Sequence, residues 1–73
     1  MFNHSRMASR RLELGLTQLQ CSIVAGVSTQ QWSLWENGGA SPNFSNVCMI
    51  ARILDCGLEE FKDTDEPAQA QAS

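Results

Sequence analysis

The stretch that decides the fold is residues 17–38, Thr-Gln-Leu-Gln-Cys-Ser-Ile-Val-Ala-Gly-Val-Ser-Thr-Gln-Gln-Trp-Ser-Leu-Trp-Glu-Asn-Gly. Thr17, followed three residues later by Gln20, matches the capping box that begins an α-helix. Ser28 repeats this pattern with its own glutamine three residues on. Between the two, Gly26 ends the first helix because glycine adopts positive φ without steric cost. The stretch therefore predicts two short helices joined by a tight bend.

Such a short connection forces the two helices to cross steeply, as in a helix-turn-helix. A steep crossing requires a small residue at the contact, a glycine in the turn and apolar residues on the inner face of the second helix. Ser22, Gly26, Trp32 and Trp35 meet these requirements in order, so we expect both tryptophans in the core. The face of the second helix that then points outward is polar and rich in amides: Thr29, Gln30, Ser33 and Leu34, flanked by Gln31 and Asn37.

The sequence on either side predicts further helices and no strands, because the period-2 alternation of strands is absent. One helix is expected over residues 5–14, ending at Gly15, after a frayed terminus that contains His4. Another begins at Ser41-Pro42-Asn43 and ends near residue 54, and a short one covers residues 58–62 with Phe61 turned inward. The buried stripe of the fourth helix is predicted to be Phe44, Val47, Cys48, Ile50, Ala51 and Leu54.

These elements predict a compact all-α domain of five helices over residues 1–62. Residues 63–73 carry no large apolar side chain and are expected to form a disordered acidic tail. A chain of 73 residues is long enough for one domain only. No apolar run is long enough to cross a membrane, and the first eleven residues lack a secretory apolar stretch. We therefore expect an intracellular, cytoplasmic protein.

The composition argues against an enzyme and against a metal or other cofactor. No paired acid and base, and no nucleophile with an adjacent histidine, is recognisable. Three cysteines and one histidine lack the paired spacing of zinc ligands. We interpret Cys21, Cys48 and Cys56 as reduced, small apolar residues of the core.

The net charge of −3 is unevenly distributed. Residues 1–56 hold four arginines against three carboxylates, whereas residues 57–73 hold one lysine against five carboxylates. The acidity therefore belongs to the C-terminal end, while the first eleven residues are basic. The overall charge does not exclude a polyanionic partner.

Several segments together resemble the Cro/repressor-type helix-turn-helix family of phage and bacterial transcriptional regulators. The matching segments are RLELGLTQ at 11–18, AGVS at 25–28, WENG at 35–38, SP at 41–42 and IA at 50–51. The resemblance implies a lambda-repressor-like fold, a homodimer, and double-stranded DNA as the partner. In such proteins the second helix of the motif enters the major groove, and the dimer binds a short pseudo-palindromic operator.

The resemblance also implies roles for individual residues. Arg11 is expected to form a structural ion pair with Glu36. Base contacts fall on the outward face of the second helix, where glutamine can bond both N6 and N7 of adenine and leucine can touch a thymine methyl. The base-reading set is Thr29, Gln30 and Leu34, with Ser28 and Gln31 adjacent; the phosphate set is Gln18, Arg10, Arg6, Asn37 and Ser33.

Two features depart from the family pattern. The loop Gly39-Ala40-Ser41 lacks the usual basic residues, and no basic residue lies between Val27 and Ala51. Because phosphate neutralisation supplies most non-specific affinity, this predicts weak DNA binding unless the chain dimerises or the arginines of residues 6–11 contribute.

The second departure is that relatives tend to have polar residues where this chain has Leu19, Ile23 and Val24. These side chains either form a partner or dimer surface or repack around Cys21, which stands where a leucine is usual. The alternative function is accordingly a protein-interaction module, such as a subunit of a toxin–antitoxin pair, with little or no DNA binding.

Overall fold

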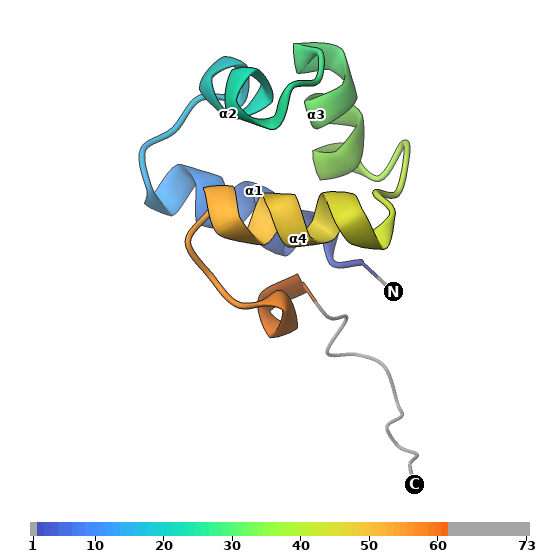
Figure 1. The fold of residues 1–73 in the computed structure, drawn as a ribbon. Helices are drawn as coiled ribbons and strands as arrows, with labels where there is room; N and C mark the ends of the chain where they lie inside the picture. The colour runs from blue at the N-terminus through green and yellow to red at the C-terminus, as the bar shows by residue number, and fades with distance from the viewer. Residues whose placement is uncertain (1, 62–73) are drawn as a thin grey trace, which may run out of the picture.

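The computed structural model describes residues 2–61, so the predicted tail at 63–73 lies outside the described residues. The elements are α1 (His4–Glu13), α2 (Gln18–Ala25), α3 (Thr29–Asn37), α4 (Phe44–Ile53) and the 3₁₀-helix η1 (Leu58–Phe61). Figure 1 shows α2 and α3 on one side of α4 and η1 on the other. None of the helices in this part of the chain is long and apolar enough to cross a membrane.

The prediction of five α-helices is wrong, because the described residues form four α-helices and one 3₁₀ turn. The fifth segment, η1, has only four residues. The Glu60 N–H donates to the Gly57 carbonyl at 3.1 Å, which is the i to i+3 bond of a 3₁₀ turn. A segment this short closes one turn and then ends.

The capping residues predicted for the central pair of helices are confirmed. At α2 both halves of the capping box form: Gln20 N–H donates to Thr17 Oγ1 at 3.0 Å, and Thr17 N–H donates to Gln20 Oε1 at 2.8 Å. At α3 only one half of the predicted box forms: the Ser28 hydroxyl accepts from the Gln31 N–H at 3.0 Å, but the Gln31 side chain does not accept from the Ser28 N–H. Gly26, with φ of 75°, ends α2 in the left-handed conformation. Each of these signals is local, which is why the sequence predicts the element bounds.

The contact between α2 and α3 is made as the sequence predicts. Ser22 is buried, and its hydroxyl donates to the Leu19 carbonyl at 2.8 Å, so its polar group is satisfied within the helix. Trp32 and Trp35 are both buried in the core, with ring centroids 6.1 Å apart in an edge-on arrangement. The inner face of α3 is therefore confirmed.

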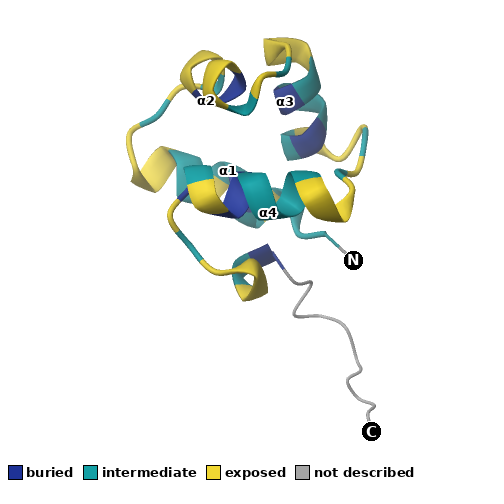
Figure 2. Cartoon of the chain, in the orientation of Figure 1, coloured by how far each residue is buried: buried dark blue, intermediate teal, exposed yellow. Residues whose placement is uncertain are grey.

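The core is built mainly from α1, α3, α4 and η1, and Figure 2 shows the buried residues on the inward sides of these elements. Phe44, predicted to join the buried stripe of α4, is instead 73% exposed. It is the first residue of α4, and the elements that pack on this helix cover its later turns. The buried side chains of the core are Met7, Cys21, Trp32, Trp35, Ile50, Ala51, Leu54 and Phe61.

The N-terminal residues are ordered, which corrects the prediction of a frayed terminus around His4. Asn3 caps α1, and its N–H donates to the Phe61 carbonyl at 2.7 Å. Phe2 packs on Phe61 with ring centroids 5.3 Å apart. His4 Nδ1–H donates to the Trp35 carbonyl at 2.7 Å, satisfying an acceptor near the C-terminus of α3. The terminus thus fastens α1 to both η1 and α3.

Candidate nucleic-acid interface

The first turn of α3 presents polar side chains outward. Thr29 and Gln30 are exposed, whereas Gln31 and Leu34 are half-buried. Within residues 2–61 the Gln30 side-chain amide has no hydrogen-bond partner, so both its donor and its acceptor are available. An amide with this freedom can form the bidentate contact to the edge of adenine. Of the predicted base-reading residues, Gln30 combines an exposed side chain with an amide that has no partner among residues 2–61.

Three other members of the base-reading set, Ser28, Thr29 and Leu34, have contacts inside the protein, whereas Gln31 is half-buried. Ser28 uses its hydroxyl to cap α3. Thr29 Oγ1 lies 3.3 Å from Ser22 Oγ, a hydrogen bond that fixes the start of α3 against α2. A Cβ placed on Gly39 would lie only 2.8 Å from Leu34 Cδ2, so the Leu34 side chain rests against the loop that follows α3. These contacts orient the helix and occupy the side chains of Ser28, Thr29 and Leu34.

One buried carboxylate joins three helices. Glu36 of α3 accepts two hydrogen bonds from Arg11 of α1, at 2.6 Å from Nε and 3.1 Å from Nη2, and one from Gln18 Nε2 of α2 at 3.0 Å. The Trp32 indole N–H donates to the same group. The Glu36 side chain is 6% exposed and that of Arg11 is 12% exposed. Arg11 and Glu36, expected as an ion pair, therefore also position Gln18.

The electrostatics of this group follow from its contacts. Burial by itself opposes ionisation of Glu36, but the hydrogen bonds from Arg11, Gln18 and Trp32, together with the Arg11 charge, outweigh it. The net effect holds the pKa of Glu36 below its usual value. On the partner side, the hydrogen bonds that Arg11 donates to Glu36 raise the pKa of Arg11 further, although burial opposes this. The pair therefore remains charged at neutral pH.

Two arginines expected to contact phosphate have structural partners instead. Arg10 Nε donates to the Leu54 carbonyl at 2.9 Å and its Nη2 donates to the Asp55 carbonyl at 3.0 Å, so Arg10 caps the C-terminus of α4. Arg6 Nε donates to Glu60 Oε1 at 2.8 Å. A phosphate would have to compete with these bonds. The sequence contained no signal for them, because they depend on where α4 and η1 lie against α1.

The remaining residues of the phosphate set lie near the ends of helices. Gln18 is the first residue of α2, and its carbonyl Oε1 is not used by the bond to Glu36, which comes from Nε2. Asn37 is the last residue of α3, and its Oδ1 accepts from the Gly39 N–H at 2.9 Å. Ser33 is half-buried on α3. A helix N-terminus such as that of α2 offers backbone N–H groups to an anion.

The apolar side chains of α2 point to solvent. Leu19 is 57% exposed, Ile23 69% and Val24 71%, whereas Cys21 is buried. Their exposure is compatible with the sequence interpretation of a partner or dimer surface. Val24 also lines one hollow together with Cys21.

The cysteines have no disulfide partner among the described residues, where Cys21 is buried and Cys48 and Cys56 are half-buried. Cys21 lies in the core and Cys56 packs against it, but the prediction that Cys48 is a core residue is wrong, because it lies on a less covered side of α4. In the same part of the chain no group of three or more His, Cys, Asp or Glu side chains lies close enough to hold a metal ion. Among the described residues, the candidate functional features are the α2–α3 pair and the outward face of α3.

Two steeply crossing helices around Gly26, with an exposed amide face on the second, define the class of the protein as a helix-turn-helix domain. The family model described as helix-turn-helix matches residues 7–61, and the chain belongs to this family of DNA-binding domains, which is not a family of enzymes. A search of curated proteins gives no match.

Two solved structures of one repressor are similar to this chain. The crystal structure of the P22 c2 repressor in complex with synthetic operator 9T, in the presence of Tl⁺, has a TM-score of 0.73 and 27% identity, covering 81% of this chain and 89% of that one. The solution structure of the DNA-binding domain of the same repressor has a TM-score of 0.75 at 27% identity, covering 81% of this chain and 78% of that one. The four-helix arrangement is therefore that of a repressor DNA-binding domain.

Proposed function

We propose that this protein is a sequence-specific DNA-binding transcriptional regulator of the repressor type. As a homodimer in the cytoplasm, it places α3 of each copy in the major groove of a short pseudo-palindromic operator. The observation that carries the proposal is the exposed, unpartnered amide of Gln30 in the first turn of α3. The similarity to the P22 c2 repressor, which was solved with a synthetic operator, supports it.

The proposed contacts divide into base reading and phosphate binding. Gln30 reads an adenine, with Thr29, Gln31 and Leu34 contributing at the edges of the contact, so the half-site contains A·T pairs. The N-terminus of α2 with Gln18, and the end of α3 with Asn37, bind the backbone. Since Arg6 and Arg10 are held within the chain, few cations reach phosphate. The dimer then supplies the affinity that one copy lacks.

The experiment starts with selection from a random duplex pool by the purified full chain, followed by fluorescence anisotropy on the selected duplex and a shuffled duplex. Two half-sites about 10 base pairs apart are expected, one helical turn. Gln30→Ala should weaken binding to the selected duplex by about 1–3 kcal/mol and leave the shuffled duplex unchanged. Gln18→Ala, a change at the proposed backbone contact, should weaken both duplexes alike.

An equal loss on both duplexes with Gln30→Ala would remove the base-reading role. No selection of any sequence by a folded chain would contradict the proposed function itself and would favour the alternative, a protein-interaction module. Tryptophan emission distinguishes a folded variant from an unfolded one, since Trp32 and Trp35 are buried.

A further inference from the structure

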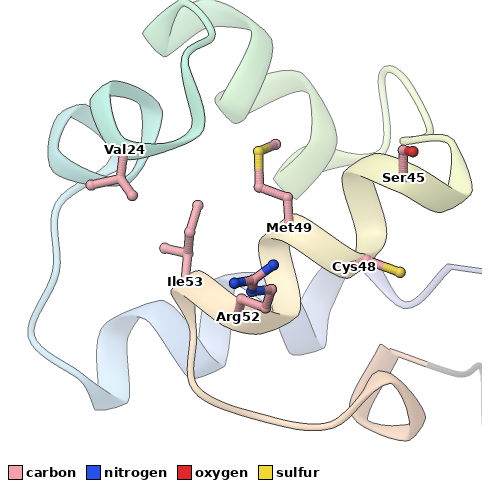
Figure 3. Close-up of a pocket in the computed structure, with 6 residues that line it drawn as sticks. All are labelled: Val24, Ser45, Cys48, Met49, Arg52 and Ile53. Carbon is pink, nitrogen blue, oxygen red and sulfur yellow. The ribbon is translucent and has the colours of Figure 1, made fainter.

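A groove runs between α2 and α4. It consists of two hollows of about 420 Å³ and 240 Å³ that share Val24 and Ile53. The larger hollow is lined also by Met49 and Arg52, and Figure 3 shows Ile53 extending from α4 toward Val24 of α2. We call this the α2–α4 groove.

Side chains of both helices line the groove. Cys21, which is 1% exposed, lines the smaller hollow. Val24 at the shared edge is 71% exposed. Leu19 and Ile23, on the same helix, extend the apolar surface beyond the edge of the groove. Several exposed apolar side chains on one short helix of a small domain are typical of a protein contact.

One cation lies at this apolar groove. Arg52 is exposed and lines the larger hollow. Among residues 2–61 it is the one arginine without a carboxylate partner, since Arg6, Arg10 and Arg11 all form ion pairs. An apolar groove with one unpaired guanidinium is complementary to a helix whose apolar face is flanked by a carboxylate.

We propose that the α2–α4 groove binds an amphipathic helix of another protein, with its apolar side chains over Val24, Met49 and Ile53 and a carboxylate paired with Arg52. The groove contains none of the residues assigned above to base or phosphate contacts, and no residue of α3 lines it. The proposal therefore goes beyond DNA binding and does not depend on it. Under this proposal, the exposed side chains of α2 contact a partner helix that lies against one face of the domain.

The test uses three synthetic 16-residue peptides on one alanine- and glutamine-based helical scaffold, titrated into the ¹⁵N-labelled full chain. The first has leucines along one face and a flanking glutamate, the second has lysine in place of that glutamate, and the third has alanine in place of the leucines. The first should shift the amide resonances of Val24, Met49, Arg52 and Ile53. The second should bind about two- to fivefold more weakly, the range for a partly exposed ion pair, and the third should not bind.

Two variants and a control locate the contact. Arg52→Glu should reverse the order of the first two peptides. Val24→Glu should abolish binding of the first peptide while DNA binding and helicity stay intact, because this side chain is largely exposed. Leu58→Ser is the matched control, since it changes an exposed apolar residue on η1, outside the groove.

Equal affinity for the acidic and basic peptides would overturn the role of Arg52. Resonance shifts away from the groove, no binding of the first peptide at millimolar concentration, or binding unaffected by Val24→Glu would each overturn the proposal. Sedimentation equilibrium of the free chain gives one further outcome: a dimer lost with Val24→Glu would show that a second copy, and not another protein, covers the groove.

Discussion

Replacing Glu36 with glutamine removes the charge that α1, α2 and α3 share. The carboxylate accepts bonds from Arg11, Gln18 and Trp32 and is 6% exposed. Glutamine has nearly the same shape but only one acceptor oxygen, and its NH₂ group would face donors. About half of the hydrogen bonds are lost, and the Arg11 guanidinium, 12% exposed, is left without a counter-charge.

The magnitude follows from these losses. Removing one partner of a buried ion pair costs about 3–5 kcal/mol. Because glutamine retains one acceptor and Arg11 still donates to the Leu16 carbonyl at 2.8 Å, we expect a loss of about 3 kcal/mol. A chain of this length has a total stability of roughly 4–11 kcal/mol. The variant should therefore lose a large fraction of its stability, and its Tm should fall by about 12–24 °C.

The assay is urea unfolding at pH 7 followed by the emission of Trp32 and Trp35, with the slope m compared to confirm that the native state is equally compact. Glu13→Gln is the matched control, because Glu13 also pairs with arginines but its side chain is 50% exposed. Its urea midpoint should move little. If Glu36→Gln lowered the midpoint no more than Glu13→Gln, the reasoning from burial would be refuted.

Burial raises the pKa of Glu36, but the hydrogen bonds from its donors outweigh burial and lower it. The stability that ionised Glu36 gives to the fold is therefore complete above the unfolded pKa of about 4.3, and it is lost as the pH falls through the pKa of the folded state. Between pH 6 and 3 the urea midpoint of the native chain should fall more steeply than that of Glu36→Gln, and parallel curves would contradict this. Arg10→Met should cost about 1–2 kcal/mol by freeing the Leu54 and Asp55 carbonyls. The same variant should leave the salt dependence of DNA binding unchanged, whereas a slope lower by about 0.9 would show that Arg10 binds a phosphate.

The sequence predicts those parts of the fold that depend on local chemistry. Thr17 and Ser28 cap their helices with groups three residues away, and Gly26 supplies the positive φ of the turn by itself. The N-terminus is different. His4 bonds a carbonyl 31 residues away, and no local pattern specifies that partner. Asn3 was the available signal, since an asparagine before a polar helical turn is typical of an N-cap.

The candidate site likewise has residues whose positions the sequence predicts and residues whose contacts depend on packing. Once Trp32 and Trp35 define the inner face of α3, helical geometry alone assigns Gln30 to the outer face. The capping role of Arg10 cannot be predicted from helical geometry, because the packing of α4 is what brings the Leu54 carbonyl near it. The α2–α4 groove is likewise a consequence of packing, since it reflects how closely two helices approach around Cys21.

The Glu36 carboxylate affects both the stability of the domain and the relative positions of the proposed DNA contacts. α3 has nine residues and is too short to be stable alone in water, so its orientation depends on tertiary contacts. Its C-terminal half is held by the bond from Arg11 of α1, and the same carboxylate holds the amide of Gln18 at the start of α2. The interior Glu36 carboxylate therefore helps to hold α3 in position relative to the proposed phosphate contact at Gln18, together with the direct packing of α2 on α3. DNA recognition by this chain should weaken when the Arg11–Glu36 pair is broken, even if every residue that faces the DNA is unchanged.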